Sequence, residues 1–164
     1  MKRIGIYGGT FNPPHVGHIR AARYALTALE LEKLLVIPSF ISPHKQLPEG
    51  SASARQRMEM LQLCFADEQN MEVSDLELQR GGASYTYETV AQVKQQYPDA
   101  ELVLFMGTDM FLSFLDWKNP ERIMESASLG VYCRGDRDEA EAIARKKEAL
   151  EGMGARVYME GNPV

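Results

Sequence analysis

Short apolar runs alternate along the chain with longer segments whose apolar residues recur every three or four positions. The short runs are typical of buried strands and the periodic segments of amphipathic helices. We predict strands over residues 2–7, 34–37, 71–74, 101–106, 129–132 and 156–159, and helices over residues 16–31, 54–67, 86–97, 120–125 and 136–153. Between them we expect a long loop over 39–53, an irregular segment over 76–84, and a loop with one helical turn over 107–119.

The order of these elements predicts an α/β protein. Strands that alternate with helices favour a parallel sheet with right-handed crossovers. The uninterrupted apolar run from Leu102 to Met106 indicates a strand covered on both faces. No stretch reads as a linker, so we expect residues 1–164 to form a single domain.

A parallel sheet also predicts where a ligand binds. Ligands of such sheets lie beyond the carboxyl ends of the strands. We therefore expect the segments after Tyr7, Ile37, Met106 and Tyr132 to converge on one cleft.

Composition narrows the class of protein. The 164 residues include 18 Lys and Arg against 23 Asp and Glu, a net charge of −5, with 45% apolar residues. This balance fits a folded globular chain and disfavours partners such as nucleic acid or a membrane surface. No run of about 18 apolar residues is present, so we expect no membrane span. Two isolated cysteines, Cys64 and Cys133, form no disulfide framework, and we expect a cytoplasmic protein in which both pack in the core.

The segment from Gly8 to His18 carries the most chemical information. Gly8 and Gly9 allow the backbone to approach a ligand closely, and His15 and His18 are spaced to share one face of a helical turn. Free N–H groups at the start of that helix, together with two imidazoles, would form a phosphate site. The alternatives are a simple tight turn, or two zinc ligands. We expect no protein-bound metal, because the chain holds one other histidine and no cysteine or carboxylate close to the pair.

These residues resemble the T/HxGH nucleotidyltransferases, whose pattern GGTF(D/N)PxHxGH is matched in full. The resemblance implies a Rossmann-like doubly wound parallel sheet and transfer of a nucleotide from ATP with release of pyrophosphate. It implies that His15 and His18 are the catalytic residues and that Mg²⁺ bridges the ATP phosphates. The ATP-binding residues that it implies are Gly8, Gly9, Thr10, Phe11, His15, His18, Gly107 and Asp109.

Further segments resemble the bacterial nicotinate-nucleotide adenylyltransferases. They are PSFISPHK from Pro38, RQRM from Arg55, ELQRGGASYTYET from Glu77, GTD from Gly107 and WK from Trp117. The resemblance implies nicotinic acid mononucleotide as the acceptor. The acceptor-binding residues that it implies are Lys45, Ser84, Tyr85, Thr86, Trp117 and Arg134. Trp117 would face the pyridine ring, and backbone N–H groups near Tyr85 and Thr86 would receive the ring carboxylate.

Each of these residues also has an ordinary structural interpretation, and other functions stay open. Trp117 can be a core residue, Asp109 a helix cap, and Tyr85–Thr86 simply the start of a helix. Phosphopantetheine adenylyltransferase is the nearest alternative enzyme, although it usually has Thr at the position of His15. A nucleotide-binding domain without activity is the alternative from another class.

The last residues differ from the family pattern. The family continues into an SSTx(I/V)R segment and a final helix, whereas this chain stops at Val164, where that segment would begin. We therefore expect a C-terminally truncated form of the fold, with apolar surface near the last strand that would favour a homo-oligomer.

Overall fold

The structure is a computed structural model, which describes residues 2–43, 46–132 and 137–160. Within them, six parallel strands form one sheet in the order β3-β2-β1-β4-β5-β6. The strands are β1 (Arg3–Gly9), β2 (Lys33–Pro38), β3 (Met71–Val73), β4 (Glu101–Gly107), β5 (Ala127–Tyr132) and β6 (Val157–Glu160). The predicted doubly wound parallel sheet is confirmed.

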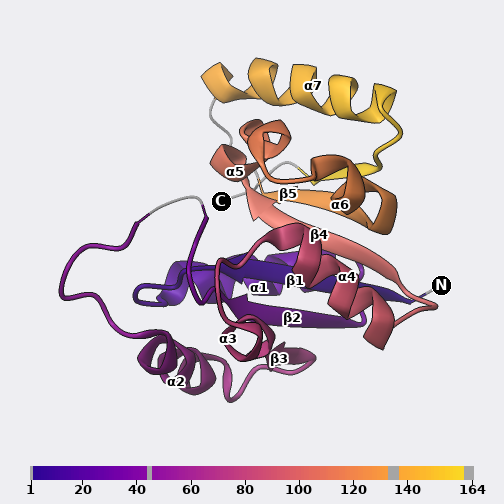
Figure 1. Cartoon of the computed structure of the whole chain (residues 1–164). Coiled ribbons are helices and arrows are strands. Elements are labelled where there is room, and N and C mark those ends of the chain that lie inside the picture. Colours follow the sequence, from indigo (N-terminus) through magenta and orange to yellow (C-terminus); the bar gives the residue numbers. More distant parts are fainter. Residues whose placement is uncertain (1, 44–45, 133–136, 161–164) are drawn as a thin grey trace.

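Helices cover both faces of the sheet (Figure 1). The helical elements are α1 (Val16–Ala28), α2 (Ala54–Phe65), α3 (Leu76–Arg80), α4 (Thr86–Gln96), α5 (Thr108–Leu112), the 3₁₀ turn η1 (Phe114–Asp116), α6 (Pro120–Ser126) and α7 (Arg137–Gly152). Within the described ranges, no helix has both the length and the apolar character needed to cross a bilayer.

Strand β4 is buried on both faces of the sheet, as its continuous apolar run predicts. Leu102, Leu104 and Met106 pack into the core that α4 and α6 cover, whereas Val103 and Phe105 pack into the core beneath α1 and α2. Successive side chains of a strand point to opposite faces, so a strand buried on both faces needs an apolar residue at every position.

Helix α2 begins where a local signal predicts it. The Ser53 hydroxyl accepts the backbone N–H of Gln56 at 3.1 Å, and the Gln56 side chain accepts the N–H of Ser53 at 2.9 Å. This reciprocal cap satisfies two donors that the helix start would otherwise leave unpaired.

The prediction for residues 76–84 was wrong, because Leu76–Arg80 form the short helix α3. Five residues are too few to form a helix on their own. Leu76 is buried in the core and Glu77 is bonded to Thr89 of α4, so tertiary contacts stabilise this turn. The first helix is also shorter than predicted and ends at Ala28, followed by Leu29 as its cap.

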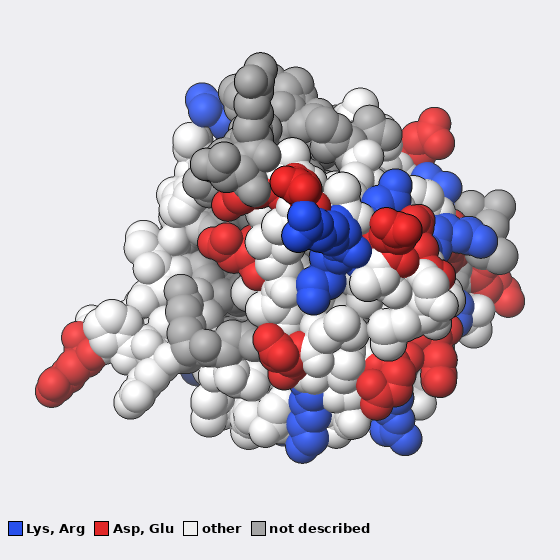
Figure 2. Space-filling model, turned by 90° about the horizontal axis from the view of Figure 1, so that it is seen from above, with Lys and Arg blue, Asp and Glu red and all other residues white. Residues whose placement is uncertain are grey.

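The surface carries charges of both signs. On the face seen in Figure 2, which looks down on the side where α7 lies in Figure 1, basic and acidic side chains are interspersed. One pair lies within α7, where an Arg145 guanidinium N–H donates to Oε1 of Glu141 at 2.7 Å.

Candidate active site

The direction of winding reverses between β1 and β4. These strands are neighbours in the sheet, yet the chain runs outward from them toward opposite edges. A doubly wound sheet opens a crevice at such a point, beyond the carboxyl ends of the two strands. Gly8 and Gly9 end β1 and Gly107 ends β4, and all three line one cavity.

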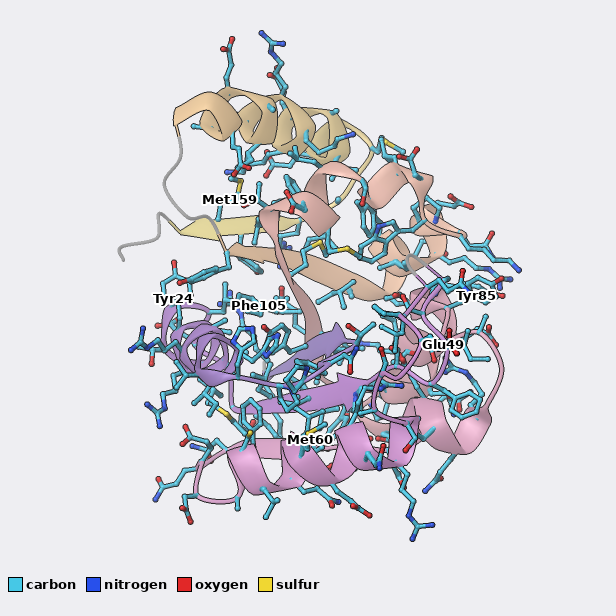
Figure 3. The ribbon with its side chains drawn as sticks, turned by 90° about the vertical axis from the view of Figure 1, so that its left-hand side faces the viewer. Tyr24, Glu49, Met60, Tyr85, Phe105 and Met159 are labelled. Atoms are coloured by element: carbon cyan, nitrogen blue, oxygen red, sulfur yellow. The ribbon has the colours of Figure 1, made fainter. Side chains whose placement is uncertain are left out.

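Figure 3 looks onto these strand ends. Phe105 of β4 lies near the centre, Tyr24 of α1 on one side, and Tyr85, at the start of α4, on the other. The cavity is lined by Gly8, Gly9 and His18 and also by Thr86 and Trp117. One neighbouring cavity shares His18 with it, and another shares Thr86 and Trp117. The predicted convergence of the segments after Tyr7, Ile37 and Met106 is present, because Gly8, Ser39, Ser42 and Gly107 line the same cavity. The segment that directly follows Tyr132 lies outside the described residues.

His15 and His18 lie together at the start of α1. Their rings stack with centroids 3.9 Å apart and planes at 30°. The N–H of His15 donates to Nδ1 of His18 at 3.0 Å, and the N–H of Gly17 donates to Nδ1 of His15 at 3.0 Å. A neutral imidazole that accepts at Nδ1 carries its proton on Nε2. Each ring therefore offers Nε2–H as a donor.

One expectation about this helix start needs correction. The sequence suggested free backbone N–H groups, but the N–H of Gly17 is already bonded to His15. The backbone N–H of Gly17 is therefore not available to a phosphate, and the imidazole N–H groups are the donors in its place.

His18 is only half-buried, yet its surroundings keep it neutral. Burial, and then the neighbouring His15, lower the pKa of His18 to about 4. Removing the ring from water disfavours its charged form, and a second imidazole adds to that effect. At neutral pH, His18 is a hydrogen-bond donor without a positive charge.

The His18 ring packs against the aromatic rings of Phe11 and Tyr7. Phe11, which we expected to bind ATP, is 3% exposed, and its ring meets that of His18 edge-on with centroids 4.9 Å apart. Tyr7 packs against Phe11 at 5.5 Å. Burial, and then Tyr132, raise the pKa of Tyr7 to about 12, so it keeps its proton. Tyr7 lines the cavity and was missed because one tyrosine in an apolar strand looks like a core residue.

A second cavity lies beside the histidines. Its lining includes His15, His18 and Gly107, together with Asp109 and Tyr132. Asp109 is exposed in α5, and its interpretation as a helix cap is wrong, because α5 is capped by Gly107 without a side-chain bond. Glu139 of α7 also lines this cavity and was not predicted.

Trp117 occupies the opposite end of the main cavity. Its Nε1–H donates to the Ser113 hydroxyl at 3.2 Å, and its ring packs on Phe114 with centroids 5.0 Å apart. The side chain is 8% exposed. The indole is thus anchored in the core and also lines the cavity, and its contact with a pyridine ring stays a prediction.

The start of α4 forms the adjacent wall. Thr86 lines the main cavity and, with Tyr85 and Trp117, a smaller neighbouring one. The N–H of Tyr85 donates to the Ala83 carbonyl at 3.0 Å, so it is not free for a ligand, which corrects part of our expectation. Lys118 lies over the Tyr85 ring, with Nζ 4.3 Å from its centroid.

Ser84 has a bonding role that the sequence did not indicate. Its hydroxyl accepts the N–H of Phe40 at 2.8 Å, and its own N–H donates to the Ile41 carbonyl at 2.8 Å. These bonds attach the segment after β2 to the segment before α4. Ser84 is 4% exposed and still lines the cavity.

Arg57 joins the two loops that flank the cleft. It is 2% exposed; its guanidinium donates to the Thr10 carbonyl at 2.7 Å and to the Phe40 carbonyl at 3.3 Å. Burial lowers the pKa of this guanidinium. Sequence reasoning did not select Arg57, since an arginine in an amphipathic helix normally faces water.

Two buried polar groups at the site were also missed. Ser39 lines the cavity, and its buried hydroxyl has no hydrogen-bond partner among the described residues. Glu77 is 7% exposed and lines the same cavity. Two residues that we predicted to bind the acceptor, Lys45 and Arg134, lie outside the described residues, as does Cys133.

Comparisons with known proteins show the family of the chain. The model of the family described as Cytidylyltransferase-like matches residues 6–153. A protein of Shouchella clausii named "Probable nicotinate-nucleotide adenylyltransferase" is 38% identical over 134 residues, covering 82% of this chain and 69% of the relative. A protein of the same name from Gemmatimonas aurantiaca is 36% identical over 155 residues, covering 94% of this chain and 72% of the relative.

A solved structure has the same fold. The nicotinic acid mononucleotide adenylyltransferase of Plasmodium falciparum, complexed with NaAD, superposes with a TM-score of 0.74 at 17% identity. The match covers 100% of this chain and 77% of that one.

Proposed function

The chain belongs to the nicotinate-nucleotide adenylyltransferase family, and from this premise we propose that it transfers the adenylyl group of ATP to nicotinic acid mononucleotide, a step of NAD biosynthesis. The observation that carries the proposal is the stacked pair His15–His18, of which His18 lines the same cavity as Thr86 and Trp117.

The reaction is a substitution at phosphorus. An oxygen of the acceptor phosphate attacks the α-phosphorus of ATP and forms a new P–O bond. The bond between the α-phosphorus and the oxygen that bridges to the β-phosphate breaks, and pyrophosphate leaves with its electron pair. An ionised acceptor phosphate needs no strong base, so positioning and stabilisation of negative charge suffice.

His18 supplies a hydrogen bond to the phosphates in this proposal. Its Nδ1 is occupied by the His15 N–H, which leaves Nε2–H to donate to a phosphate oxygen. His15 supports the same group with its own Nε2–H. Because both donors are held by backbone bonds before the reaction, little reorganisation is needed as charge develops.

Magnesium fits this site as part of the substrate. The described residues contain no group of three or more His, Cys, Asp or Glu side chains that could hold a metal ion. Mg²⁺ characteristically binds substrate phosphates and water. We therefore assign the ion to the ATP phosphates, where it neutralises negative charge.

The remaining roles follow from position. Gly8, Gly9, Thr10, Gly107 and Asp109 lie on the ATP side, in the two cavities that share His18. Ser84, Thr86 and Trp117 line the same cavity and are assigned to the acceptor. In this proposal Trp117 faces the pyridine ring. Lys45 and Arg134 stay predicted phosphate-binding residues.

Measuring pyrophosphate release tests the proposed reaction. The chain is incubated with ATP, Mg²⁺ and one acceptor, either nicotinic acid mononucleotide, nicotinamide mononucleotide or phosphopantetheine. We expect release with the first, whereas release with phosphopantetheine alone would contradict the proposal. Thermal stabilisation by ATP without release from any acceptor would indicate a nucleotide-binding protein without activity.

A further inference from the structure

Glu77 places a carboxyl group at the acceptor end of the cleft. It lies in α3, is 7% exposed, and lines the cavity together with Ser84, Thr86 and Thr89. A carboxylate almost never occurs at this depth without a charged partner. The proposed reaction as such gives it no task.

Hydroxyl groups surround this carboxyl. The Thr89 hydroxyl of α4 donates to Oε2 of Glu77 at 2.6 Å. The Ser84 side chain is also hydrogen-bonded to the Glu77 carboxyl group. An Arg80 guanidinium N–H donates to the Thr89 hydroxyl at 3.0 Å. The ion pairs found among the described residues do not include Glu77. Its negative charge is therefore only partly compensated.

The charge of Glu77 changes close to neutral pH. Burial raises the pKa of Glu77 to about 7, against the opposing effects of the Thr89 bond, the Arg80 charge and the Ser84 bond. The nearby positive charge, Arg80, is on α3 itself. The groups that face Glu77 from α4 and from the segment before α4 are the hydroxyls of Thr89 and Ser84. Other titratable groups nearby are Tyr7 and His18 farther along the cavity, and Asp116 and Lys118 in the smaller cavity beside Thr86.

We propose that Glu77 is a specificity-determining residue, whose ionisation decides how well the cleft accepts an acidic rather than an amide substituent on the acceptor ring. The inference rests on the proposed function, which places the ring between Thr86 and Trp117. A neutral Glu77 leaves the start of α4 free to attract a ring carboxylate. An ionised Glu77 repels that carboxylate, and a ring that displaces water from the cavity strengthens the repulsion.

Binding of two acceptors tests this inference directly. Trp117 is the only tryptophan in the chain, so its fluorescence reports ring binding in the cavity. Dissociation constants are measured for nicotinic acid mononucleotide and nicotinamide mononucleotide between pH 6 and 8.5. Both carry the same ribose phosphate, so titration of that phosphate cancels in the ratio of the two constants. We expect the preference for the acid to fall by roughly tenfold across this range.

Variants assign the effect to Glu77. In Glu77→Gln the preference for the acid should stay at its low-pH value throughout the range. Glu88→Gln is the matched control, because Glu88 is in the first turn of α4 but lines a groove with Arg122 instead of the cleft. It should retain the wild-type pH dependence. If Glu77→Gln does not fold, Thr89→Val removes a donor to Glu77 and should move the change in preference to higher pH.

Four results would contradict the inference. A preference that is constant with pH in the wild type would overturn it, as would a wild-type pH dependence retained in Glu77→Gln. If neither nucleotide changes the fluorescence at any pH, the proposed acceptor is wrong and the inference fails with it. Equal binding of both nucleotides at every pH would overturn the inference alone.

Discussion

The rings of His15 and His18 stack at a centroid distance of 3.9 Å, and each accepts a backbone N–H at its Nδ1. The bond to His18 comes from the N–H of His15, so the first histidine orients the second. Because the two Nδ1 atoms are occupied, the Nε2–H groups are the donors left for a ligand. The pair behaves as one preorganised unit, and several predictions concern it.

His18→Ala should lower kcat by roughly 10²–10³, the usual cost of losing one donor to developing charge in a transition state. The measurement is the initial rate of pyrophosphate release at saturating ATP and acceptor. Arg20→Ala is the control, because Arg20 is an exposed residue of the same helix. An unchanged kcat in His18→Ala would remove His18 from the proposed role.

The stability of the fold should depend on His18 in acid. The pKa of His18 is about 4 in the folded chain, below its ordinary value of 6.5. The unfolded chain therefore takes up a proton first as the pH falls, and the folded state loses stability between pH 6.5 and 4. Urea unfolding at pH 7, 6, 5 and 4 measures this loss. It should be smaller in His18→Asn, and an identical pH profile in the two proteins would contradict the prediction.

Gly17→Ala should reduce activity without destabilising the protein. A Cβ at Gly17 would lie 2.8 Å from Cε1 of His15 and 2.9 Å from its Nδ1, so the His15 ring must move. The ring is at the end of an exposed side chain and can move, but it then loses its bond to the Gly17 N–H. Alanine favours a helix interior by about 1 kcal/mol over glycine, so the two effects oppose each other. We expect a nearly unchanged Tm and a fall in kcat of about tenfold. Gly152→Ala, in α7 with open space around it, should leave kcat unchanged.

Arg57→Met should weaken binding of both substrates, because Arg57 bonds to Thr10 on the ATP side and to Phe40 on the acceptor side. Both carbonyls would lose a charged donor, and a buried polar group left unpaired costs about 1–3 kcal/mol. We expect KM to rise about tenfold for ATP and for the acceptor, with a lower free energy of unfolding. Arg55→Met is the matched control, because the Arg55 side chain on α2 is 90% exposed. A rise in only one KM would show that Arg57 does not couple the two loops.

The sequence determined much of the fold because its signals are local. Burial on both faces requires the apolar run of β4, and a Ser-x-x-Gln cap fixes the start of α2. The segment from Gly8 to His18 likewise predicted a histidine pair at a helix start. The two rings meet through a reciprocal cap, because His15 is the extended N-cap residue of α1 and not part of its first turn.

The tertiary structure alone decided which distant residues meet. Arg57 reaches carbonyls 47 and 17 residues away in the chain, and α3 forms only because Leu76 and Glu77 have partners in other elements. The left-handed backbone of Phe11, with φ of 49°, places its ring edge-on against His18 in the lining of the cavity, a contact that the sequence did not indicate. Local patterns specify which residues prefer burial and where helices begin. The neighbours of a buried charge, and so its protonation state, depend on packing between segments that only the folded chain brings together.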